Sequence, residues 1–126
     1  MPYHVSQAEF GELVERALAG LPPEFARFLE EVPVEVRDRP TPQQLRGVGL
    51  GRNDLLFGLY RGRPRTQRNV EDSAVMPDVI YIFQMPLEQI SRSEQQLVEQ
   101  VRKTVLHEIG HHFGMTEEDL EKLGYG

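Results

Sequence analysis

The sequence predicts a small α+β domain, in which a mixed sheet of few strands packs on one long helix near the C-terminus. Two observations predict this fold class. Residues 78–83 form a continuous β-branched and aromatic run, which is typical of a buried central strand. After Ser93, apolar residues recur at helical spacing for about five turns. Because 126 residues suit one domain of ordinary size, we expect 1–126 to fold as a single domain.

Two helices are expected in the N-terminal segment. Ser6 and Glu9 have the spacing of a capping box at the start of the first helix, and residues 24–31 form the second. The alternating pattern of residues 32–37 then predicts a strand. Pro33 favours an edge position for this strand, because proline cannot donate a ladder hydrogen bond.

The middle of the chain is expected to contain one strand between two irregular segments. Residues 40–53 are rich in Pro, Gly and Arg and predict a loop, residues 55–60 predict a strand, and 61–77 predict a long polar connection. Between Arg37 and Arg68 there are eight arginines against two aspartates. A solvated loop region accounts for this charge, and a surface for an acidic partner is the alternative.

The long C-terminal helix is expected to begin at a Ser93 cap, with Gln96 at the reciprocal position. Gly114 is expected to end this helix in the left-handed conformation, and Thr116 is expected to cap a short closing helix. The face that packs on the sheet is predicted to comprise Val98, Val101, Val105, Ile109 and Phe113.

Composition excludes several kinds of site. The chain has no cysteine, so disulfides, thiol catalysis and cysteine-bound zinc are excluded, and a metal site must use histidine and carboxylate. The net charge of −6 argues against a general nucleic-acid binder. No apolar run approaches the roughly 20 residues of a membrane span, and the start lacks a secretory signal. We therefore expect a cytoplasmic protein that has no membrane partner.

The segment from His107 to His111 reads His-Glu-x-x-His and falls inside the long helix. Residues four apart lie on one helical face, so both imidazoles can bind one Zn²⁺ at about 2 Å. Glu108 projects beside these two ligands, where it can hydrogen-bond a zinc-activated water instead of binding the metal. The alternative is a solvated helix face that carries two histidines by coincidence.

A catalytic zinc site needs a third protein ligand. Gly114 permits a sharp reversal, and Glu117 follows three residues later, with Glu118 and Asp119 as alternative ligands. These acids also have a structural explanation, because carboxylates in a first helical turn favour the helix dipole. His112 is about 100° away from His111 around the helix, so we expect a partly buried structural histidine there.

The segment 107–114, together with 32–36, 56–62, 77–83 and 101–106, resembles a small bacterial family of zinc metallopeptidases with a minimal zincin fold. The resemblance implies a mixed sheet of few strands, a motif-bearing helix and no C-terminal subdomain. It also implies that His107 and His111 are metal ligands and that the acid at position 117 is the third. The basic residues 63–65 depart from the family's pattern.

The leading hypothesis is therefore zinc-dependent hydrolysis of peptide bonds in a peptide or protein substrate, with Glu108 as general base. Tyr60 and the arginines of 61–68 are the only candidates that we identify for stabilising the oxyanion. One alternative is a metal-binding module without peptidase activity, in which zinc pins the final helix to the motif helix. Another is a metal-dependent RNA hydrolase, which only the basic stretch 37–68 favours.

Overall fold

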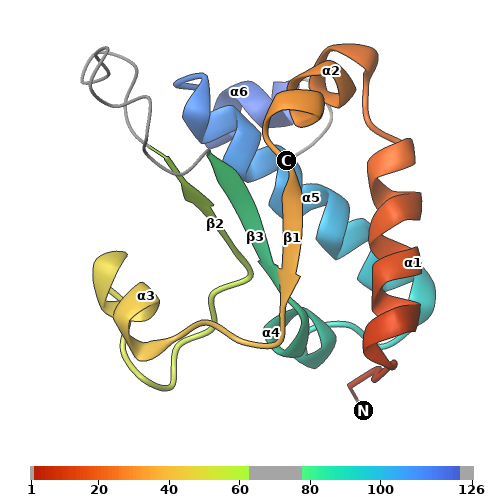
Figure 1. Ribbon diagram of the computed structural model, residues 1–126, viewed down its shortest axis with the longest axis vertical. Coiled ribbons are helices and arrows are strands. Elements are labelled where there is room, and N and C mark those ends of the chain that lie inside the picture. The colour runs from red at the N-terminus through yellow and green to blue at the C-terminus, as the bar shows by residue number, and fades with distance from the viewer. Residues whose placement is uncertain (1, 63–77, 123–126) are drawn as a thin grey trace.

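The computed structural model of the chain describes residues 2–62 and 78–122, apart from the side chains of Glu117 and Leu120. The elements follow the order α1 (Gln7–Ala19), α2 (Pro23–Glu31), β1 (Val34–Arg37), α3 (Pro42–Gly47), β2 (Gly58–Arg61), β3 (Val79–Phe83), α4 (Gln84–Gln89), α5 (Glu94–His112) and α6 (Glu117–Lys122). Figure 1 shows the strands side by side, with α1 and α5 together on one side of the sheet. This arrangement confirms the predicted α+β fold class.

The described strands form one mixed sheet in the order β1-β3-β2. β1 runs parallel to β3, with Val34 opposite Ile80, and β2 runs antiparallel to β3, with Tyr60 opposite Ile80. Every residue of β3 is buried, as its continuous apolar run predicts. The central position of this strand and the edge position of the strand after Pro33 are both confirmed.

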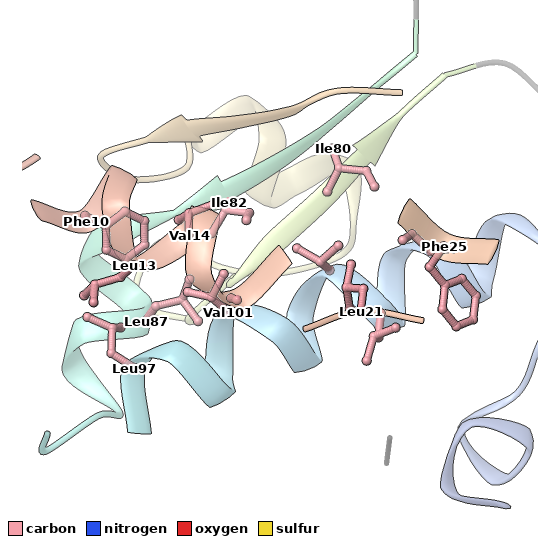
Figure 2. Close-up of a cluster of buried hydrophobic side chains, with 14 of the residues drawn as sticks. Phe10, Leu13, Val14, Leu21, Phe25, Ile80, Ile82, Leu87, Leu97 and Val101 are labelled. Atoms are coloured by element: carbon pink, nitrogen blue, oxygen red, sulfur yellow. The ribbon is translucent and has the colours of Figure 1, made fainter. Parts of the chain in front are cut away.

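The hydrophobic core lies between one face of the sheet and the helices α1 and α5 (Figure 2). Ile80 and Ile82 of β3 are fully buried there, because alternate residues of a strand point to the same side. Phe10 of α1 and Leu97 of α5 complete the contact. Each such side chain stabilises the fold by about 1.5–3 kcal/mol relative to an exposed one. This burial holds α5 in a fixed position against the sheet.

Helix α5 begins where the sequence predicts. The Ser93 hydroxyl oxygen accepts a hydrogen bond from the backbone N–H of Gln96 at 3.1 Å, and the Gln96 side chain accepts one from the N–H of Arg92 at 2.8 Å. The capping contact therefore reaches one residue further back than the usual capping box. The buried face consists of Leu97, Val101, Val105, Leu106, Ile109 and Gly110.

The end of α5 corrects one prediction. The spacing predicts a buried Phe113, but this residue is the C-cap and is 55% exposed. Because the helix ends at His112, Phe113 takes a cap conformation, and its ring lies 5.1 Å from that of Phe28 in α2. Gly114 has a φ of +74°, which confirms the predicted left-handed end of the helix.

The middle of the chain also differs from prediction. Residues 40–53, predicted as a loop, contain α3. Thr41 and Gln44 exchange side-chain to backbone hydrogen bonds of 3.0 and 2.9 Å, and this capping box starts a helix in a Pro- and Gly-rich segment. β2 begins at Gly58, three residues later than predicted. The connection predicted at 61–77 lies almost wholly outside the described residues.

Helix α4, for which no pattern was identified, follows β3 directly. Among the described helices, none is both long and apolar enough to cross a membrane.

Gly58 permits a close approach of β2 to α5. A Cβ atom at this position would lie 2.5 Å from Cγ2 of Thr104 and 3.1 Å from the carbonyl oxygen of Tyr81. The first distance is far shorter than the roughly 3.5–4.0 Å at which nonbonded carbon atoms pack, and the second is a tight contact with a main-chain oxygen. Only glycine therefore allows the strand to lie this close to the helix that carries the His-Glu-x-x-His motif.

Replacing Gly58 should destabilise the fold. We expect Gly58→Ala to lower the free energy of unfolding by about 1–3 kcal/mol, because the new methyl group overlaps the Thr104 side chain. Thr104→Ser removes the obstructing Cγ2 but keeps the hydroxyl that donates to the carbonyl oxygen of Gln100. The double variant should recover part of the loss in urea denaturation followed by circular dichroism. Equal stability of Gly58→Ala and the unsubstituted protein would contradict the steric argument.

Candidate metal centre

His107 and His111 lie on the same face of α5, as their spacing predicts. Their ring centroids are 6.2 Å apart with an interplanar angle of 85°. His107 is half-buried and His111 is exposed, whereas Ile109 between them points into the core. A zinc ion at about 2 Å from one nitrogen of each ring fits between rings at this separation. The arrangement of the two rings is therefore compatible with the predicted pair of metal ligands.

Glu108 is held against the sheet. Its Oε1 accepts a hydrogen bond from the backbone N–H of Tyr60 in β2, at 2.8 Å. The N–H of Phe83 donates to the carbonyl oxygen of Phe57, so these two opposed residues form a hydrogen-bonded pair. Hydrogen-bonded and non-hydrogen-bonded pairs alternate along two antiparallel strands, so Tyr60 belongs to a non-hydrogen-bonded pair. Tyr60 therefore turns its N–H away from β3, toward the outer edge of the sheet. One carboxylate oxygen of Glu108 is fixed on this edge strand.

A groove of about 310 Å³ runs between α5 and the chain that leads into β2. Its lining consists of Leu55, Leu56, Phe57, Gly58, Gln100, Lys103, Thr104, His107, Glu108 and His111. The helical residues in this set are three or four apart, so they form one continuous stripe along α5. The two paired histidines and the anchored carboxylate thus open into the same groove.

The third ligand predicted at Glu117 remains a prediction, because this side chain lies outside the described part of the structure. The described side chains contain no group of three His, Asp or Glu residues arranged to hold a metal. After the Gly114 reversal, α6 begins at Glu117 and contacts α5. The backbone at position 117 therefore belongs to the helix that contacts α5.

The two alternative ligands already have local partners in α6. Asp119 accepts a hydrogen bond from the N–H of Thr116 at 2.9 Å, and its own N–H donates to the Thr116 hydroxyl at 3.1 Å. This reciprocal contact confirms Thr116 as the cap of the closing helix. Glu118 is 78% exposed and lies 3.9 Å from the ammonium group of Lys122. Asp119 and Glu118 thus each have a local partner, and Glu117 as the third ligand stays a prediction.

The chain is similar to proteins already known. A family model described as zincin-like metallopeptidase matches residues 29–126. The chain belongs to this family. A solved structure of a conserved hypothetical protein from T. thermophilus is similar, with a TM-score of 0.57 and 24% identity over 86% of this chain and 94% of that chain. At this identity the likeness shows a shared fold. No curated protein matches the chain.

His112 of this zincin-like chain packs among aromatic rings instead of lining the groove. Its ring is stacked on Tyr60 with centroids 4.9 Å apart, and it lies 5.1 Å from Phe28 of α2. The side chain is half-buried, as the sequence predicts for a structural histidine. His112 thus helps to join α5 to β2 and α2, immediately after His111.

The structure assigns other contacts to two of the candidates for oxyanion stabilisation. The Tyr60 hydroxyl donates to Oδ2 of Asp78 at 2.6 Å. Arg61 donates to the Tyr81 hydroxyl at 2.6 Å, and its guanidinium lies 5.4 Å from the centre of that ring. The arginines of 63–68 lie outside the described residues. Sequence reasoning missed the backbone N–H of Tyr60, because no residue pattern marks a main-chain donor that contacts a distant carboxylate.

Adjacent histidines offer a matched test of the metal centre. We expect His111→Phe to lower zinc affinity by at least about 100-fold, because it removes one of the two paired donors. His112→Phe makes the same change one residue later, where an aromatic ring already packs on Tyr60, and should keep zinc binding. Titration against a competing chelator measures both affinities. Equal losses in the two variants would contradict the assignment of His111 as a ligand.

Proposed function

We propose that this zincin-like chain is a zinc-dependent metallopeptidase that hydrolyses peptide bonds with Glu108 as general base. One observation carries the proposal: His107, His111 and Glu108 open into a single groove beside β2, which is an edge strand of the sheet formed by the described residues. A peptide in this groove would meet metal-binding and proton-accepting side chains together. Membership of the zincin-like metallopeptidase family supports the same reaction class.

The donor set suits catalytic zinc. His107, His111 and Glu117 would hold the ion, and two histidines with one carboxylate leave a fourth position open. His111 lies in the last turn of α5, where the helix dipole favours a cation. When bound, zinc supplies the Lewis acid that polarises the scissile carbonyl and makes water acidic enough to attack near neutral pH.

Glu108 would act as the general base and then as the general acid. The Tyr60 N–H occupies Oε1 of this carboxylate, which leaves Oε2 to accept a proton from the attacking water. The same carboxyl group then gives the proton to the leaving amine, and the site returns to its starting charge. Because the backbone donor already holds this carboxylate in place, little further side-chain entropy is lost when it accepts the proton.

The main chain of a peptide substrate would bind along the outer edge of β2. Gly58 and Tyr60 form non-hydrogen-bonded pairs with β3, so their backbone groups face the outer side of β2, where the Tyr60 N–H bonds to Glu108 and Gly58 lines the groove. An extended peptide adds to such an edge through main-chain hydrogen bonds and presents alternate side chains to the neighbouring walls. A bound peptide would therefore lie alongside Glu108 and the two histidines.

One contact favours an alternative function, that of a metal-binding module without peptidase activity. Donors from α5 and from the start of α6 would join the closing helix to the motif helix, which α6 already contacts. Tight zinc binding by a protein that cleaves no peptide would support this role. RNA hydrolysis with three histidines has less support, because His112 packs on Tyr60 and His4 lies beside Glu88, at 3.4 Å from Oε1.

Replacing the general base should separate catalysis from metal binding. We expect Glu108→Gln to lower kcat for peptide hydrolysis by about 10²–10⁴-fold, because the amide cannot accept the proton from water. The amide oxygen can still accept the Tyr60 hydrogen bond, so folding and zinc content should be retained. Quenched fluorescent peptides and elemental analysis measure the two properties. Full activity in a zinc-loaded Glu108→Gln protein would disprove this mechanism.

The third ligand can be identified by comparing two neighbouring glutamates. Glu117→Gln should weaken zinc binding by at least about tenfold, since it removes a charged donor. Glu118→Gln makes the same chemical change on an exposed side chain beside Lys122 and should leave zinc affinity unchanged. Chelator competition at constant pH measures both variants. The reverse order of effects would assign the ligand to Glu118.

A further inference from the structure

The groove continues beyond the residues that the proposed reaction uses. From His107 it extends back along α5 past Thr104 and Lys103 to Gln100. The opposite wall consists of Leu55, Leu56 and Phe57, which precede β2. None of these side chains has a part in metal binding or in proton transfer as proposed. Its volume of about 310 Å³ is at the small end of the roughly 300–1,000 Å³ typical of ligand sites.

The wall before β2 is apolar and open to solvent. Leu55 is 39% exposed, and Leu56 and Phe57 are only half-buried. A large apolar side chain of a bound peptide would cover these residues and remove apolar surface of both partners from water. The backbone of this segment leads directly into Gly58 at the edge of β2, so an edge-bound peptide would pass this wall.

Lys103 is the cationic side chain of the opposite wall. It is exposed and lies one helical turn before His107. In the described part of the chain, no carboxylate lies within ion-pair distance of its ammonium group. Glu108, the acidic member of the lining, is instead anchored to the Tyr60 N–H. The charge of Lys103 is thus available to a ligand in the groove.

We propose that this part of the groove is a specificity site for peptides that combine a large apolar residue with a nearby acidic one. The apolar side chain packs against Leu55 and Phe57, and Lys103 pairs with a carboxylate within two residues of it. The ammonium group of Lys103 at this wall would attract a carboxylate of a bound peptide, and it would disfavour a basic residue at the same place. This inference rests on the proposed peptidase function.

Cleavage of a mixed peptide library, with products identified by mass spectrometry, tests the specificity. The zinc-loaded protein should cleave preferentially where a large apolar residue has an acidic residue within two positions. Lys103→Glu should reduce this acidic preference by about tenfold and favour basic residues instead. The matched control is Arg92→Glu, which makes the same charge change on an exposed residue at the start of α5, outside the groove lining. An unchanged cleavage profile in Lys103→Glu would overturn the proposal.

A binding measurement separates this inference from the proposed reaction. Zinc-loaded Glu108→Gln is titrated with labelled peptides that contain Leu-Glu, Leu-Lys or Ser-Glu in an otherwise identical sequence. The Leu-Glu peptide should bind most tightly, and Lys103→Glu in the same background should remove its advantage over Leu-Lys. This result without any cleavage by the unsubstituted protein would support the specificity site and refute the peptidase. Cleavage with equal binding of all three peptides would support the peptidase and refute the specificity site.

Discussion

The close contact between β2 and α5 is the constraint on which the candidate site depends. Gly58 allows the strand to approach Thr104, and this approach brings the N–H of Tyr60 to the carboxylate of Glu108. Because Glu108 follows His107 directly, anchoring its side chain on β2 sets the rotation of the whole motif relative to the sheet. The same contact lies beside the groove, whose two walls are α5 and the segment that leads into β2.

Two adjoining faces of helix α5 contribute to the hydrophobic core and to the candidate metal centre. Val101, Val105 and Ile109 are completely buried under the sheet, while Thr104 and Glu108 are half-buried beside β2. A carboxylate that is partly removed from water requires a partner, and an edge strand has outward-facing donors that must be satisfied. The hydrogen bond between Glu108 and Tyr60 meets both requirements, so the functional residue also stabilises the contact that positions it.

The predictions that succeeded depend on short-range patterns. The Ser93 cap, the left-handed Gly114 and the buried strand 79–83 are each encoded by a few neighbouring residues. The failures arose where two local signals disagreed or where packing decided the outcome. A capping box outweighed the Pro- and Gly-rich composition of α3, and Phe113 continued the apolar spacing but lies beyond the end of its helix.

The sequence by itself determined the helix that carries His107, Glu108 and His111, the common face of the two histidines and the fold class, because helical periodicity and capping depend on residues within a turn or two. Only the tertiary structure decided which backbone donor Glu108 meets and which side chains share its groove. The Tyr60 contact joins residues 48 positions apart, and Lys103 comes to face the segment 55–57. Such partners are set by how the sheet and helix pack, which no local pattern records.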